Sequence, residues 1–156
     1  MTTYLDTGAL VPLYVNEVFT NAITSYIEER GEAVTLHSFH RLEFENALRL
    51  KLFRGDLTHE QFLDVQRKVA SHIDLGMLMI RSVNWLSAFE TARTLSEVTT
   101  AEIGCRTLDL IHVAIAMQWS CVDFVSTDDR QLKAARRSGL NTVDLRQLID
   151  SNRDSR

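Results

Sequence analysis

The chain has 156 residues, of which 45% are hydrophobic and 24% charged, and its formal net charge is −4. These proportions are typical of one globular domain, and the negative charge argues against a protein held on nucleic acid by bulk positive charge. Cys105 and Cys121 form no close-spaced motif, so we expect buried thiols rather than a disulfide framework or a zinc site. No segment has the roughly 18 consecutive apolar residues of a membrane span, and the start of the chain does not resemble a signal peptide. We therefore expect a cytoplasmic protein that does not enter a membrane.

Short apolar runs alternate with helical patterns in the first half of the chain. The predicted elements are a strand over Thr3–Leu5, an apolar stretch over Ala9–Val15, a helix over Phe19–Arg30, a strand over Ala33–Leu36, and helices over Ser38–Arg54 and Glu60–Ile73. Gly31 and Gly55 follow two of these helices, as glycine often does. The segment from Thr58 to Gln61 matches a capping box and predicts the start of the third helix.

The predicted helix Ser38–Arg54 has two apolar rows. The first row, which we expect to face the core, is Phe39, Leu42, Ala47, Leu50 and Phe53. The helical period places Glu43 within this row and Glu45 on another side. The second row is Phe44, Leu48 and Leu52, and we expect it to contact a partner chain.

The second half continues the alternation. The predicted elements are a strand over Met77–Val83, a helix over Trp85–Val98, a polar loop over Thr99–Arg106, a helix from Thr107 to Ala116, a strand over Val122–Ser126, a helix from Thr127 to about Gly139, a strand over Thr142–Leu145 and a short helix over Arg146–Ile149. Short apolar strands separated by helices predict an α/β fold with a central parallel sheet between helices. We expect one domain over residues 1–150 and a polar tail over residues 151–156.

The helix that begins at Thr107 is apolar on nearly every side, so we expect it inside the fold. Its first turn nevertheless carries Asp109, one turn before His112. A buried charge is costly, and the helix N-terminus compensates only part of that cost. A bound cation could supply the rest, although Asp109 could also simply help to cap the helix. We interpret His112 as a hydrogen-bonded core residue rather than a metal ligand.

Acidic residues follow several of the predicted strands. Asp6 ends the first strand, Asp128 and Asp129 follow the fourth, and Asp109 and Glu43 lie on expected buried faces of helices. The carboxyl ends of parallel strands form the functional crevice of open α/β sheets, so one crevice could receive a carboxylate from each segment. Clustered carboxylates repel by about 4 kcal/mol at 4 Å and an effective dielectric of about 20, unless they share a proton or bind a cation. Oxygen ligands suit Mg²⁺ or Mn²⁺, and such a site predicts metal-assisted phosphodiester hydrolysis.

Each acid also has a structural alternative. These alternatives are capping by Asp6 with Thr7, capping by Asp128 or Asp129, and an ion pair of Glu43 with Arg41 or Arg106.

Four motifs in this order resemble the PIN-domain ribonucleases, and among them the VapC toxins of bacterial toxin–antitoxin pairs. The resemblance extends from Thr3 to about Leu145, and each motif is loose when taken alone. The motifs are Tyr4-Leu-Asp-Thr7 with Leu13-Tyr-Val-Asn-Glu17, Arg41-Leu-Glu-Phe-Glu-Asn-Ala-Leu48, Leu108-Asp-Leu-Ile-His-Val-Ala114, and Phe124-Val-Ser-Thr-Asp-Asp-Arg-Gln-Leu132.

The resemblance implies an α/β/α sandwich and an acidic pocket of Asp6, Glu43, Asp109 and Asp128 that binds one or two Mg²⁺ or Mn²⁺ ions. In that pocket Asp6 and Asp109 would be the main ligands, Glu43 would bind metal through water or orient the attacking water, and Asp128 would complete a second metal position. The resemblance also implies that the hydroxyl groups of Thr7 and Ser126 brace the pocket. Asp129 could share or replace the role of Asp128, but Ser126-Thr-Asp128 keeps the family's spacing of hydroxyl and acid.

The same resemblance implies an RNA substrate, a homodimer and a cognate antitoxin. A basic rim for the RNA is predicted from Arg41, Arg49, Lys51, Arg54, Arg106 and Arg130. Two other classes compete with the nuclease: a receiver-type signalling domain, which needs paired acids after the first strand, and a catalytically silent PIN-like binding module. A haloacid-type phosphatase would need Asp-x-Asp, whereas Asp6 is followed by Thr7 and Gly8.

Overall fold

The computed structural model describes the backbone of residues 2–153 and the side chains of residues 2–149. The chain divides into two compact units. Unit 1 combines the segment that ends at Asp6 with the segment that begins at Val83, and unit 2 runs from Thr7 to Ser82.

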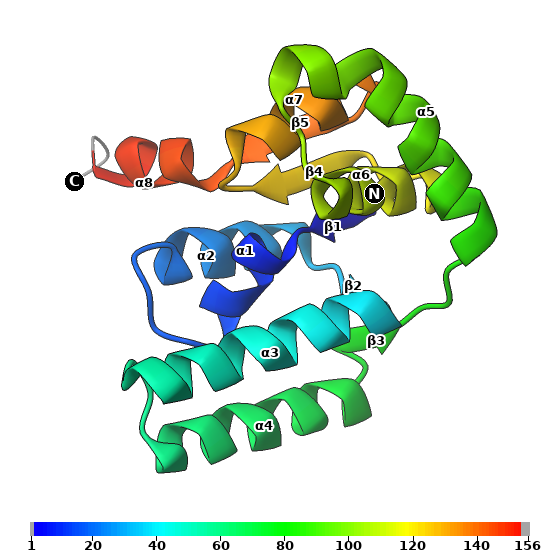
Figure 1. The fold of residues 1–156 in the computed structure, drawn as a ribbon. Helices are drawn as coiled ribbons and strands as arrows, with labels where there is room; N and C mark the ends of the chain where they lie inside the picture. Colours follow the sequence, from blue (N-terminus) through cyan, green and yellow to red (C-terminus); the bar gives the residue numbers. More distant parts are fainter. Residues whose placement is uncertain (1, 154–156) are drawn as a thin grey trace. The chain divides into compact units, whose positions relative to one another are not determined.

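Unit 1 contains a parallel sheet with the strand order β1-β4-β5 (Figure 1). Its elements are β1 (Thr3–Leu5), α5 (Trp85–Ile103), α6 (Thr107–Gln118), β4 (Asp123–Ser126), α7 (Asp129–Arg137), β5 (Asn141–Asp144) and α8 (Leu145–Arg153). Leu5 pairs with Val125, so Asp6 and Ser126 come next at the carboxyl ends of adjacent strands. Helix α7 packs on β4 and β5, and α5, α6 and α7 pack against one another.

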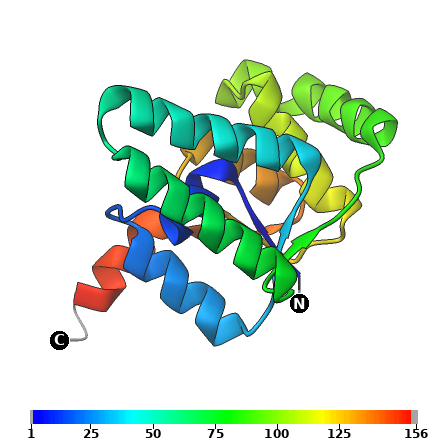
Figure 2. The ribbon, with the colours of Figure 1, turned by 90° about the horizontal axis from the view of Figure 1, so that it is seen from below.

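Unit 2 contains the parallel strand pair β2-β3 and a helical hairpin. Its elements are α1 (Thr7–Leu10), η1 (Val11–Leu13), α2 (Thr20–Arg30), β2 (Val34–Leu36), α3 (Ser38–Arg54), α4 (His59–Asp74) and β3 (Leu78–Ile80). Helices α3 and α4 lie side by side in both ribbon views (Figures 1 and 2). The predicted capping box is confirmed, because Thr58 and Gln61 exchange their two side chain–backbone hydrogen bonds at the start of α4.

The structure confirms the predicted fold class, a helix-rich α/β fold with a central parallel sheet flanked by helices. The five described strands nevertheless form two sheets rather than one. Apolar strand patterns predict that strands are buried and parallel, but they do not say which strands pair. In the described part of the chain, none of the helices combines the length and the apolar character that crossing a membrane requires.

The predicted polar loop over Thr99–Arg106 is wrong, because α5 continues to Ile103 and ends at the left-handed Gly104. The hydroxyl of Thr99 is buried and donates to the Leu95 carbonyl oxygen at 2.6 Å. Hydroxyl groups that bond within the helix satisfy their own polarity, so a polar stretch can continue a helix.

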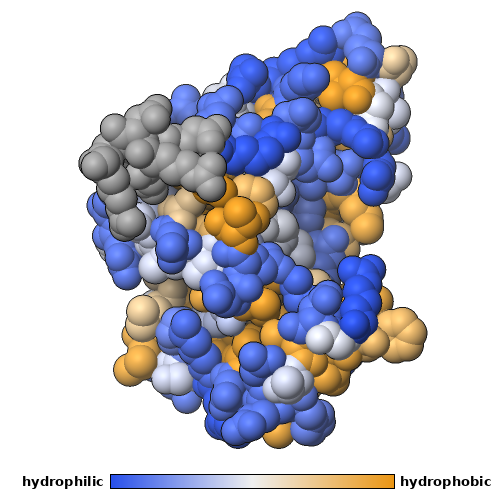
Figure 3. Space-filling model, turned by 90° about the vertical axis from the view of Figure 1, so that its left-hand side faces the viewer, coloured by the Kyte–Doolittle hydropathy of each residue, from blue (hydrophilic) through white to orange (hydrophobic). Residues whose placement is uncertain are grey.

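The two apolar rows of α3 are assigned to the wrong sides in the sequence prediction. Phe44 and Leu48 are buried within this chain, whereas Leu42 is 66% exposed and Phe53 is 88% exposed. The Phe44 ring packs edge-on against Tyr14, with centroids 5.4 Å apart. The exposed row, rather than the buried one, is therefore available to a partner, and apolar side chains lie among polar ones on the surface (Figure 3).

Helix α6 is the buried helix that the sequence predicts, except near its ends. Leu108 is 50% exposed and Met117 is 37% exposed, whereas every residue between Asp109 and Ala116 is buried. The buried, hydrogen-bonded position predicted for His112 is confirmed, because its Nδ1 lies 2.8 Å from the buried Tyr4 hydroxyl. Both cysteines are free and buried, as predicted.

The last helix is longer than predicted, because α8 continues to Arg153. It therefore includes the first residues of the predicted polar tail, and the rest of that tail, residues 154–156, lies outside the described residues.

Candidate active site

Ser126 connects two of the predicted acids in unit 1. The Ser126 hydroxyl donates to Oδ2 of Asp6 at 2.5 Å and accepts the backbone N–H of Asp128 at 2.9 Å. Ser126 is fully buried and Asp6 is 3% exposed. The register of β1 and β4 places these groups together, since adjacent parallel strands end at the same edge.

Asp128 caps helix α7. Its Oδ1 accepts the backbone N–H groups of Arg130 at 2.7 Å and Gln131 at 3.3 Å. The capping alternative is thus confirmed for Asp128. Both cap bonds use Oδ1, and a carboxylate oxygen has two lone pairs, so the cap alone does not exhaust the acceptor capacity of this side chain.

Asp109 is held from two sides at the start of α6. Its Oδ2 accepts the backbone N–H of Arg106 at 2.9 Å, and its Oδ1 accepts the side-chain amide of Gln131 at 3.1 Å. The capping role is confirmed for one oxygen, while the other oxygen is bound by a side chain from α7. Asp109 is 9% exposed, so it remains a largely buried carboxylate.

Hydrogen bonds therefore connect three acidic residues, which we call the acidic cluster: Asp6, Asp109 and Asp128, with Ser126 contacting the backbone N–H of Asp128 and Gln131 contacting its carboxylate. The connections run through the Ser126 hydroxyl and through Gln131.

The pKa of the nearby Cys105 thiol is affected by the negative charges of the acidic cluster. Burial raises the pKa of Cys105 first, and the charges of Asp109 and Asp128 raise it further. The Cys105 thiol donates to the Arg130 carbonyl oxygen at 3.4 Å. Anionic groups are thus concentrated where α6 and α7 begin.

Asp129 points elsewhere. It is exposed, and its Oδ1 accepts a hydrogen bond from the guanidinium of Arg146, which also bonds Asp144. The Arg146 hydrogen bond holds the pKa of Asp129 below its ordinary value. The carboxylate of Asp129 is thus engaged by Arg146. Asp128 instead hydrogen-bonds Ser126 through its backbone N–H and Gln131 through its carboxylate.

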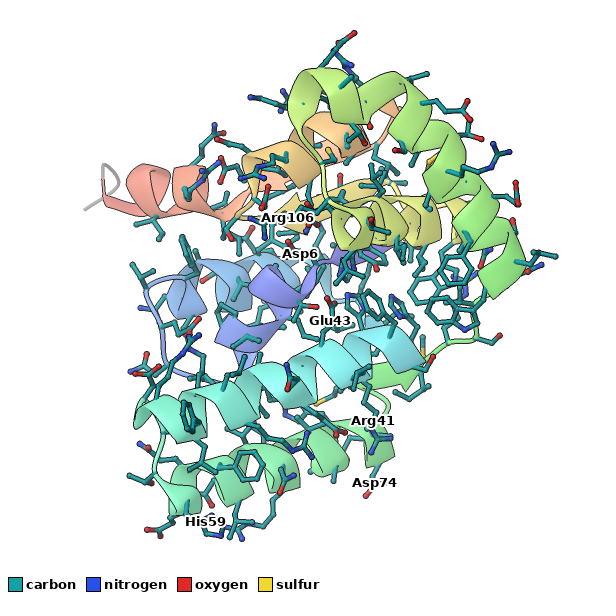
Figure 4. All side chains as sticks on the ribbon, in the orientation of Figure 1. Asp6, Arg41, Glu43, His59, Asp74 and Arg106 are labelled. Carbon is teal, nitrogen blue, oxygen red and sulfur yellow. The ribbon has the colours of Figure 1, made fainter. Side chains whose placement is uncertain are left out.

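Glu43 belongs to unit 2, where it lies half-buried on α3 rather than in the core. The Thr7 hydroxyl donates to Oε2 of Glu43 at 2.6 Å. Arg41, a predicted partner of Glu43, instead donates to Glu45 at 2.9 Å. Figure 4 shows Glu43 and Arg41 projecting from different sides of α3.

Gln131 is the residue of this site that the sequence prediction missed. It is 8% exposed, and its Oε1 is a buried acceptor with no hydrogen-bond partner among the described residues. Carboxylate and amide oxygens are the donor atoms that Mg²⁺ and Mn²⁺ prefer, so this residue set fits a hard divalent cation. The available signal was a polar residue at the third position after Asp128, next to the apolar Leu132.

The predicted basic rim is only partly available for a ligand. Arg41 and Arg49 pair with Glu45, and Lys51 pairs with Glu17.

In unit 1, Arg106 and Arg130 are exposed at the starts of α6 and α7. Helix α7 adds exposed basic residues that the sequence prediction did not include. Lys133 forms no ion pair with any described residue, Arg136 donates to the Thr142 hydroxyl, and Arg137 pairs with Glu102.

No family model matches the chain, and no curated protein matches it. Solved structures do. The crystal structure of FitAcB from Neisseria gonorrhoeae superposes with a TM-score of 0.64 at 15% identity, covering 93% of this chain and 98% of that one. The crystal structure of PAE2754 from Pyrobaculum aerophilum has a TM-score of 0.55 at 14% identity, covering 97% and 94% of the two chains. At these identities the likeness concerns the fold, which is PIN-like.

Proposed function

We propose that this protein is a metal-dependent endoribonuclease that hydrolyses RNA phosphodiester bonds. The observation that carries the proposal is the acidic cluster of a PIN-like fold, in which Asp6 and Asp128 follow the adjacent strands β1 and β4, and Gln131 connects Asp128 to Asp109 at the start of α6. Carboxylates that gather in one partly buried site repel one another, and a divalent cation offsets this repulsion.

In this proposal Asp6, Asp109 and Asp128 hold one or two Mg²⁺ or Mn²⁺ ions. Such an ion lowers the pKa of a bound water and stabilises the charge that develops on a phosphoryl oxygen. Ser126 orients the carboxylate of Asp6, and the Arg106 backbone fixes that of Asp109. These hydrogen bonds limit the reorientation of the ligands, which is how outer residues support a metal site.

We also propose that Glu43 takes part by binding metal through a water molecule, with Thr7 as its brace. The support is the Thr7–Glu43 hydrogen bond of 2.6 Å, because Thr7 directly follows Asp6 in the chain. This assignment follows the sequence resemblance for both residues. We assign the fourth acid to Asp128 rather than Asp129, because Asp129 is engaged by Arg146 outside the connections of the cluster.

The sequence resemblance further supports a toxin role, with a cognate antitoxin and a homodimer as partners. Exposed basic side chains lie at the starts of α6 and α7, from Arg106 and Arg130, and along α7, from Lys133. These side chains would contact RNA phosphates. A receiver-type domain is less well supported, because a single acid, Asp6, stands at the end of β1. A silent binding module would not need the three acids of the acidic cluster.

A cleavage assay with two neighbouring variants tests the proposal. End-labelled RNA is incubated with Mn²⁺, and wild type is compared with Asp128→Asn and Asp129→Asn. Asparagine also caps helices well, so Asp128→Asn should keep α7 intact. We expect Asp128→Asn to lose cleavage and Asp129→Asn to retain it. Cleavage that persists in EDTA, or that both variants retain, contradicts the metal-dependent site.

A further inference from the structure

Gln131 hydrogen-bonds two acids of the acidic cluster, Asp128 and Asp109, which lie at the starts of α7 and α6. Its backbone N–H donates to Oδ1 of Asp128 and its side-chain N–H donates to Oδ1 of Asp109. One residue therefore touches both carboxylates with different groups. A residue that served only the cap of α7 would need its backbone alone.

The amide oxygen of Gln131 has no such partner. Oε1 is buried, and no described residue donates a hydrogen bond to it. Its orientation is set, because the Nε2 atom of the same amide must face Asp109 to donate. Oε1 and Nε2 share one carbon, so the acceptor lies beside the carboxylate that Nε2 holds.

A buried acceptor without a donor is rare in folded proteins, and it is best explained by a group that the site binds. The neighbouring carboxylates of Asp109 and Asp128 accept hydrogen bonds but cannot donate them when ionised. A water molecule supplies two donors. A divalent cation in the acidic cluster would bring such water, since Mg²⁺ and Mn²⁺ keep several waters when bound to few carboxylates.

We propose that Gln131 is a positioning residue of the metal site: its N–H fixes Asp109 while its Oε1 accepts a hydrogen bond from a water held in the acidic cluster. The inference rests on the proposed function, because it requires that the cluster binds a divalent cation. It adds a specific role for a residue outside the acids themselves. Outer residues that orient metal ligands change metal affinity by about 10–100-fold when they are mutated.

Isothermal titration with Mn²⁺ alone, without RNA, tests this role. Gln131→Met keeps the size of the side chain and removes both hydrogen-bonding groups, and Gln131→Glu keeps an acceptor oxygen. Gln147→Met is the matched control, because Gln147 is exposed in α8 of the same unit. Thermal unfolding of each variant in EDTA reports whether it folds without metal.

We expect Gln131→Met to weaken Mn²⁺ binding by about 10–100-fold. Gln131→Glu keeps the acceptor oxygen but loses the N–H that fixes Asp109, so it should bind Mn²⁺ more tightly than Gln131→Met does, and Gln147→Met should match wild type. Equal Mn²⁺ affinities of wild type and Gln131→Met would overturn the role of Gln131 and leave the nuclease proposal standing. If the melting temperature of Gln131→Met is lower than that of wild type by the same amount with and without Mn²⁺, the role of Gln131 is likewise overturned and the nuclease proposal stands. If wild type itself binds no Mn²⁺, both this inference and the metal-dependent function are wrong.

Discussion

Replacing Ser126 by alanine should destabilise the metal-free protein more than the loss of an ordinary hydroxyl does. The change removes the hydrogen bond to the buried carboxylate of Asp6 and leaves the backbone N–H of Asp128 without its acceptor. A hydrogen bond to a charged group contributes about 1.5–3 kcal/mol, and a neutral one about 1 kcal/mol. We therefore expect a loss of about 3 kcal/mol, which corresponds to roughly 6–12 °C in melting temperature for a chain of this size.

The assay is thermal unfolding in EDTA, followed by far-ultraviolet circular dichroism. Ser138→Ala is the matched control, because the Ser138 hydroxyl donates one neutral hydrogen bond to the Ala134 carbonyl oxygen at 2.9 Å in the same unit. That variant should lose about 1 kcal/mol or less. If Ser126→Ala melts within error of Ser138→Ala, the hydroxyl does not hold the carboxylate of Asp6, and the proposed bracing of the cluster is refuted.

Three further outcomes are expected. Arg146→Gln should raise the pKa of Asp144 toward its ordinary value of 3.8, because the Arg146 hydrogen bond lowers it; carboxyl NMR titration measures this. In wild type, the ion pair stabilises the fold above about pH 4, and this stabilisation is lost as the pH falls through the lowered pKa of Asp144. Arg146→Gln lacks this stabilisation, so its acid unfolding should begin at a higher pH than that of wild type. The Cys105 thiol, whose pKa is raised by burial, should resist a disulfide reagent at neutral pH until urea unfolds the protein, and fast native labelling would contradict its burial. Lys133→Gln should weaken binding to single-stranded RNA and reduce the slope of log K against log salt by about 0.7, and an unchanged slope would remove α7 from the RNA surface.

The sequence predicted most elements of the fold because apolar periodicity and turn residues are local signals. The helix Ser38–Arg54 has the predicted bounds, and all five predicted strands are present, although β3 (Leu78–Ile80) is much shorter than the predicted strand Met77–Val83. The side of α3 that faces the core was not predictable in the same way. Two apolar rows satisfy the helical period equally, and packing by Tyr14 selects the row of Phe44. Local patterns likewise cannot show that β2 and β3 pair apart from β1.

The candidate site likewise contains residues that local sequence signals identify and one residue that only a long-range contact identifies. Strand ends predict Asp6 and the pair Asp128 and Asp129, and an acid in an apolar helix predicts Asp109, whereas the preference for Asp128 over Asp129 came from the family resemblance. Gln131 could not be found in this way, because an amide in a polar helix start has many ordinary explanations. Its importance depends on the contact with Asp109, which is far away in the sequence and is made only in the folded chain.

The most direct test of the central claim is metal-dependent cleavage of total RNA by the purified, partner-free protein, followed by sequencing of the cleaved ends. Asp6→Asn is the matched variant, because its amide oxygen can still accept the Ser126 hydroxyl while the charge is removed. The account predicts discrete cuts with Mg²⁺ or Mn²⁺ that disappear in EDTA and in the folded variant. An absence of cuts by folded wild type, or equal cuts by Asp6→Asn, would contradict a nuclease built on the acidic cluster.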